Sequence, residues 1–191
     1  GVNLFQDAQD PNGLSKEAYY FLGGIFAHIK AMTLIFNPLV NSYKRLVPGY
    51  EAPTCICWSA RNRTPLVRIP ATRGEDTRIE LRSPDPACNP YLALALCLAA
   101  GLDGIRKKMS PPPSLEGDMY LLSPEERRNQ GIEDLPGNLK EAVDAFEKDP
   151  LMKEVLGEEV CRKYVWAKRR EWESYNAQIS AWELQNYLLR I

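Results

Sequence analysis

The sequence predicts an α+β fold, with strands at about 54–83 packed by helices and followed by a helical C-terminal region. One observation is a stretch of apolar residues at helical spacing between Ser15 and Phe36. Another is a set of β-forming runs that turn residues separate, at 54–60, 64–70 and 77–83. A series of helix caps follows residue 111. At 191 residues the chain is long enough to bury one core.

The first helix has a clear beginning and end in the sequence. Ser15 is a good N-cap, and the dipeptide Asn37-Pro38 stops the helix. The apolar stripe consists of Ala18, Phe21, Leu22, Ile25, Ile29 and Met32. His28, the only histidine of the chain, lies off this stripe. We therefore interpret it as a packing or surface residue and not as a metal ligand.

Charged residues alternate along the last of the β-forming runs. Arg78, Glu80 and Arg82 fall on one strand face, and Ile79 and Leu81 fall on the other. This pattern alone fits an ion-pair ladder between strands, or a pocket for an anionic substrate. All cations between residues 61 and 82 are arginines, whose planar forks bind carboxylate or phosphate at two points.

The neighbouring segment favours the pocket. Residues 41–53 read NSYKRLVPGYEAP, in which Pro48-Gly49 marks a turn that Arg45 and Glu51 flank. A polar loop beside a sheet that carries arginines is a good candidate for a substrate lid.

The second half of the chain is predicted to be helical. Asn89 caps a second helix with Pro90 at its first position, and residues 92–102 are apolar nearly all round, so we expect this helix at the centre. Further helices are predicted from caps at Ser123, Asn138, Asp149 and Ser180, with a charged helix from Glu158 to about Tyr175. The last helix is rich in large apolar residues, and one interpretation docks it on this domain.

Composition excludes several classes of function. A formal charge of −1 and a pI near 6.0 provide no field for nucleic acid or for an anionic membrane. The apolar run 92–102 is too short to cross a bilayer. The five cysteines show no zinc spacing, and Cys55 and Cys57 share a strand face too closely for an ordinary disulfide. We expect reduced cysteines and a cytoplasmic location.

Three long segments resemble type I glutamine synthetase. They are residues 37–53, which end in NSYKRLVPGYEAP, residues 61–70, which read RNRTPLVRIP, and residues 78–95, which read RIELRSPDPACNPYLALA. The similarity continues through AGLDGI at 100–105 and more loosely to the C-terminus. These motifs are long, ordered and specific to that family.

The resemblance implies a role for each site residue. It makes Arg45, Glu51, Arg63 and Arg82 ligands of substrate glutamate, and Glu51 and Arg63 catalytic. Glu51 matches the flap residue that takes a proton from bound ammonium. Arg63, Arg68 and Arg78 match residues that bind ATP. Glu80 matches a metal ligand, and its carboxylate suits the hard ions Mg²⁺ or Mn²⁺.

The activity implied is an ATP-dependent ligase that forms glutamine from glutamate and ammonia through a γ-glutamyl phosphate. ATP is the co-substrate, and the family implies a homo-oligomer of stacked hexameric rings. In that family the C-terminal helix reaches a neighbouring subunit, which is the second interpretation of the last helix.

The resemblance covers the C-terminal portion of the catalytic domain. Residues 1–110 correspond to substrate-site strands and helices, and residues 111–191 to a helical C-terminal region. The family's N-terminal domain, the first part of its catalytic domain and its metal-binding histidine motif are not in this sequence, so we expect this chain alone to be inactive. The alternatives are a non-catalytic truncated homologue that acts in assembly or regulation, and an unrelated anion-binding module, which the matched motifs disfavour.

Overall fold

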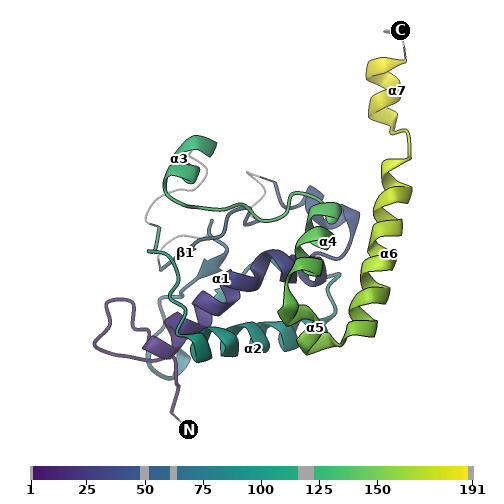
Figure 1. The fold of residues 1–191 in the computed structure, drawn as a ribbon. Coiled ribbons are helices and arrows are strands. Elements are labelled where there is room, and N and C mark those ends of the chain that lie inside the picture. The colour runs from purple at the N-terminus through teal and green to yellow at the C-terminus, as the bar shows by residue number, and fades with distance from the viewer. Residues whose placement is uncertain (1, 48–51, 61–63, 116–122, 189–191) are drawn as a thin grey trace.

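The structure is a computed structural model that describes residues 2–47, 52–60, 64–115 and 123–188 (Figure 1). Helix α1 spans Lys16–Phe36 and helix α2 spans Pro90–Lys107. The predicted caps are confirmed: Ser15 accepts a hydrogen bond from the Ala18 amide, and Asn89 accepts from the first turn of α2. The fold is α+β, as predicted.

Helices α1 and α2 approach each other closely because glycines line their contact. A Cβ added at Gly24 would lie 2.0 Å from the Ala100 carbonyl oxygen, and one added at Gly104 would lie 2.1 Å from the Tyr20 carbonyl oxygen. Both distances are below any normal carbon–oxygen contact, so only glycine permits this crossing. The crossing places α1 in the middle of the molecule (Figure 1).

The expectation that α2 is central is only half right. Ala93, Leu96 and Ala100 are buried, whereas the opposite face exposes Tyr91 at 83%, Leu94 at 70% and Leu98 at 58%. Within the described residues, nothing covers that face. Helix α1, which is apolar and long enough to cross a membrane by length and composition, is instead the central one. Its most apolar window is 67% buried inside the molecule, as in the core helix of a globular protein.

The sheet is smaller than the sequence suggests. Strands β1 (Trp58–Ser59), β2 (Val67–Arg68) and β3 (Glu80–Leu81) lie in the order β1-β2-β3. β1 pairs with β2 in parallel, and β2 pairs with β3 antiparallel. The start of the predicted strand 54–60 bonds elsewhere, because the amide of Ile56 donates to Glu133 and that of Leu135 donates to Thr54.

The C-terminal half consists of the predicted helices. They are α3 (Pro124–Asn129), α4 (Leu139–Lys148), α5 (Pro150–Leu156), α6 (Glu158–Asn176) and α7 (Ala181–Tyr187). Asn138, Asp149 and Ser180 each accept a hydrogen bond from the first turn that follows them, which confirms these caps. Helix α4 packs its buried face, which includes Val143 and Phe146, against α1, and α6 packs on α4.

Helix α7 does not dock on the rest of the chain. It extends beyond α6, clear of the other described elements (Figure 1), and has no buried residue. Trp182 is 59% exposed and Leu188 is 65% exposed. The interpretation that docks this helix on its own domain is therefore wrong for the described structure.

His28 joins three helices. Its Nδ1 lies 2.7 Å from Asp149 Oδ2, at the cap of α5, and its Nε2 lies 3.1 Å from Asp103 Oδ2 on α2. Lys107 also donates to Asp103. The interpretation of His28 as a packing residue is confirmed. The spacing of residues along the helix did not predict its two carboxylate partners, Asp149 and Asp103.

Candidate functional site

The centre of the candidate site is Glu80, which two arginines hold. Arg68 stands opposite Glu80 in the β2–β3 ladder, and its Nε and Nη2 donate to Oε2 at 2.9 and 2.6 Å. Arg78 donates through Nε and Nη2 to the other oxygen, Oε1, at 3.2 and 3.0 Å. Each carboxylate oxygen therefore faces a two-donor guanidinium, and a cross-strand ion pair, one of the two alternatives for this row, is present.

The cluster carries an excess of positive charge. Hydrogen bonds from Arg68, aided by Arg78, hold the pKa of Glu80 below its usual range, so Glu80 is ionised at neutral pH. One carboxylate then opposes two guanidinium groups, which are always charged. The Arg78 side chain is 51% exposed, so part of this charge faces solvent and is open to an anionic ligand.

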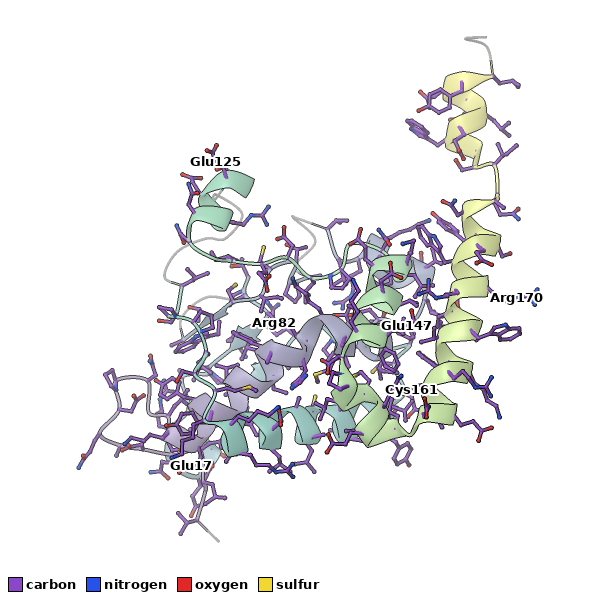
Figure 2. The ribbon with its side chains drawn as sticks, in the orientation of Figure 1. Glu17, Arg82, Glu125, Glu147, Cys161 and Arg170 are labelled. Carbon is purple, nitrogen blue, oxygen red and sulfur yellow. The ribbon has the colours of Figure 1, made fainter. Side chains whose placement is uncertain are left out.

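Arg45 reaches the same sheet from a different part of the chain. It follows the 3₁₀ helix Val40–Lys44, and its Nη2 donates to the Ser83 carbonyl oxygen at 2.5 Å. Ser83 comes directly after Arg82, whose backbone amide continues the β2–β3 pairing by donating to Leu66. The Arg82 side chain, labelled in Figure 2, donates through Nη1 to the Pro65 carbonyl oxygen at 3.4 Å. The structure thus brings Arg45 to the end of β3.

Two predicted residues lie outside the described residues. They are Glu51 in the expected flap and Arg63 in the segment between β1 and β2. Their catalytic roles therefore stay predictions. The sequence-predicted residues that the structure describes are Arg45, Arg68, Arg78, Glu80 and Arg82.

The described residues do not form a complete metal centre. Both oxygens of Glu80 are engaged by arginines. No group of three or more His, Cys, Asp or Glu side chains that could hold a metal occurs in the described part of the chain. Mg²⁺ needs several oxygen ligands, so Glu80 alone does not fit this ion.

Sequence reasoning missed Asn37 as part of this site. Its side chain is fully buried, and Nδ2 donates to the Ser83 carbonyl oxygen at 2.9 Å. In the sequence it reads as the stop of the first helix and as the first residue of the family-like segment 37–53. The one available signal is its place four residues before NSYKR, which does not reveal a contact 46 residues along the chain.

The comparisons with known proteins agree with these observations. The family model described as "Glutamine synthetase, catalytic domain" matches residues 1–187. The chain belongs to the glutamine synthetase family. It is 54% identical over 188 residues to a glutamine synthetase from Methanosarcina mazei, covering 98% of the chain and 42% of that relative. It is 53% identical over 186 residues to one from Thermotoga maritima, covering 97% of the chain and 42% of that relative.

Two solved structures of GmaS show the same fold. A GmaS/ADP complex superposes with a TM-score of 0.86 at 43% identity, over 98% of this chain and 43% of the other. GmaS without ligand superposes with a TM-score of 0.83 at 43% identity, over 98% of this chain and 42% of the other. The chain spans about 42% of the length of its curated relatives. The resemblance stated from the sequence is confirmed.

Proposed function

We propose that the protein carrying this chain is an ATP-dependent ligase that forms glutamine from glutamate and ammonia through a γ-glutamyl phosphate. The observation that carries the proposal is the glutamine synthetase match over residues 1–187, which includes the two arginines that bind Glu80. Because the chain spans about 42% of its relatives, the activity is proposed for a protein of their full length.

The arginine cluster supports this chemistry physically. Glutamate and ATP are both anions, and their approach is unfavourable unless fixed cations neutralise the repulsion. We assign Arg45 and Arg82 to the glutamate carboxylate, and Arg68 and Arg78 to ATP. Adenine nucleotide binding by a relative supports the second assignment, because GmaS has been solved with ADP.

We assign proton removal from ammonium to Glu51, and stabilisation of the transferring phosphoryl group to Arg63. An acyl phosphate hydrolyses readily, so a flap that carries Glu51 and excludes water serves the reaction. A metal role for Glu80 with Mg²⁺ or Mn²⁺ requires this carboxylate to exchange at least one guanidinium partner and to gain further ligands. Cytoplasmic location and a homo-oligomer of stacked rings complete the proposal, and the projecting helix α7 supports assembly with other subunits.

The test is product formation with glutamate, ATP, Mg²⁺ or Mn²⁺, and ammonium or hydroxylamine. We expect glutamine or the hydroxamate from a full-length protein that carries residues 1–191, and none from this chain alone. Glu51→Ala should cut turnover at least tenfold while ATP binding persists. Lys44→Ala, a change of the exposed neighbour of Arg45, is the control and should stay within about twofold.

The outcomes separate the two candidate functions. A full-length protein that binds ATP but forms no product would favour the non-catalytic homologue that acts in assembly or regulation. Full activity of Glu51→Ala at saturating ammonium would refute the assignment of proton removal from ammonium to Glu51.

A further inference from the structure

The end of α1 is tied to the end of β3 by hydrogen bonds. The amide of Asp85 donates to the Phe36 carbonyl oxygen at 3.0 Å, and Asn37 Nδ2 donates to the Ser83 carbonyl oxygen at 2.9 Å. Asn37 and Ser83 are both 0% exposed. A hydrogen bond between groups that water does not reach fixes their relative position more firmly than a surface contact.

The Ser83 carbonyl oxygen also receives Arg45, at 2.5 Å from Nη2. Two donors, one from an amide and one from a guanidinium, therefore converge on a single backbone oxygen. The segment between Asn37 and Arg45 is closed by two hydrogen bonds. Ser42 Oγ accepts from the Leu39 amide, and the Arg45 amide donates to the Ser42 carbonyl oxygen. Asn37, Ser83 and Arg45 thus form one rigid triangle.

Each of these three residues also has a polar side-chain atom that makes no hydrogen bond. Among the described residues, Asn37 Oδ1, Ser83 Oγ and Arg45 Nε are buried without a hydrogen-bond partner. A buried guanidinium donor without an acceptor is costly, and most such groups in folded proteins find one. The Nε donor of Arg45 is therefore available to a ligand oxygen, whereas its Nη2 donor bonds to the Ser83 carbonyl oxygen.

We propose that Asn37 is a positioning residue, which fixes the Ser83 carbonyl oxygen and through it the Arg45 guanidinium, so that the unused Arg45 donor meets a ligand carboxylate. The proposal rests on the proposed function in one respect, that the carboxylate belongs to glutamate. Asn37 itself touches neither substrate nor ATP in this scheme.

The decisive variant is Asn37→Asp in the full-length protein. Aspartate cannot donate to Ser83, and it places a carboxylate beside a guanidinium that shares the same oxygen within 3 Å. We expect the KM for glutamate to rise about tenfold, which corresponds to about 1.4 kcal/mol, with the KM for ATP changed less than about twofold. Asn41→Asp, the same charge change at an exposed position of the same turn, should leave both constants unchanged.

A second variant covers loss of folding. If the buried charge of Asn37→Asp unfolds the protein, Asn37→Ala removes the donor without adding charge and should raise the same constant in the same direction. An equal rise in the KM for glutamate and for ATP, or no rise in either folded variant, would overturn the proposal.

A measurement without activity separates this proposal from the proposed function. In the 191-residue chain, the nitrogen-15 resonances of the Arg45 guanidinium should shift in Asn37→Ala, and those of Arg78 should not. Unshifted Arg45 resonances would refute the positioning role even if the full-length protein makes glutamine. If the Arg45 resonances shift but the full-length protein has no ligase activity, the positioning role of Asn37 stands and the assignment of glutamate as the ligand is refuted.

Discussion

The Arg68–Glu80 contact shows what a two-point ion pair does at the scale of a single residue. Arg68 grips one oxygen of Glu80 across the ladder, with both side chains about 30% exposed. Arg78, which lies just before β3, bonds to the other oxygen and is 51% exposed. Geometry and partial burial favour the first pair energetically, because exposed ion pairs contribute little. The same two arginines are the proposed ATP ligands, so they contribute both to the stability of the fold and to the proposed nucleotide binding.

Arg68→Lys should lower the free energy of unfolding of this chain by about 1 kcal/mol. Lysine keeps the charge but cannot make two parallel hydrogen bonds to one carboxylate. Urea denaturation at pH 7 measures the change. The matched control is Arg78→Lys, which should cost less than about 0.5 kcal/mol because this pair is more exposed. Equal losses in the two variants would show that the cross-strand geometry adds nothing.

At the scale of elements, His28 connects α1 to α2 and to the start of α5. Both ring nitrogens face carboxylate oxygens, so only the doubly protonated imidazolium donates to both. The hydrogen bond to Asp149, which outweighs burial, raises the pKa of His28 above its ordinary value of 6.5. Asp103 also contacts Lys107, so it remains paired on the α2 side. The stability of this three-helix junction therefore depends on pH.

We expect the contribution of His28 to be fully present below pH 6.5, the unfolded value, and to be lost as pH rises through the higher folded pKa. His28→Gln should destabilise the chain by about 2–4 kcal/mol at pH 6, because it leaves the partly buried carboxylate of Asp149 without its cation. The loss should shrink at pH 9. Thermal and urea unfolding across this range measure both effects.

A change elsewhere on α1 provides the control. Lys30→Gln removes an ion pair with Glu133 in which the side chains are 42% and 69% exposed, so it should cost less than about 0.5 kcal/mol at either pH. A loss in His28→Gln that is the same at pH 6 and pH 9 would mean that His28 packs as a neutral ring.

At the scale of the whole molecule, many large apolar side chains of the described residues remain exposed, and two helices carry clusters of them. One is the outer face of α2, with Tyr91, Leu94 and Leu98, and the other is helix α7 with Trp182 and Leu188. A monomer rarely leaves such surfaces uncovered. Helix α7 lies at the far end of α6, away from the core (Figure 1), where contact with a second molecule meets no obstruction from the described residues.

We therefore expect the purified chain to self-associate, with α7 as one contact. Trp182→Ser should shift sedimentation velocity profiles toward the monomer at micromolar concentration, because the apolar area that drives association is reduced. The matched control is Trp166→Ser on α6, where the tryptophan is 61% exposed, close to the 59% of Trp182. A monomeric wild-type chain, or an equal shift in both variants, would contradict the role of α7.

Local chemistry accounts for the features that the sequence predicted well. Ser15, Asn89, Asn138, Asp149 and Ser180 cap their helices as expected, because a cap is satisfied by amides two or three residues away. The alternation in the last run placed Ile79 and Leu81 toward the core and Glu80 with the arginines, because strand faces follow from period two. The family motifs added a role for each residue, which no local rule supplies.

The sequence by itself thus determined the order of helices and strands, the caps and the candidate arginines. Tertiary structure alone decided which face of α2 is buried, which carboxylates meet His28, and that Arg68 pairs with Glu80 across β2 and β3. It also decided that Asn37 and Arg45 share the Ser83 carbonyl oxygen. The physical reason is distance along the chain: caps and face patterns involve near neighbours, whereas these contacts join residues brought together only when the core closes around α1.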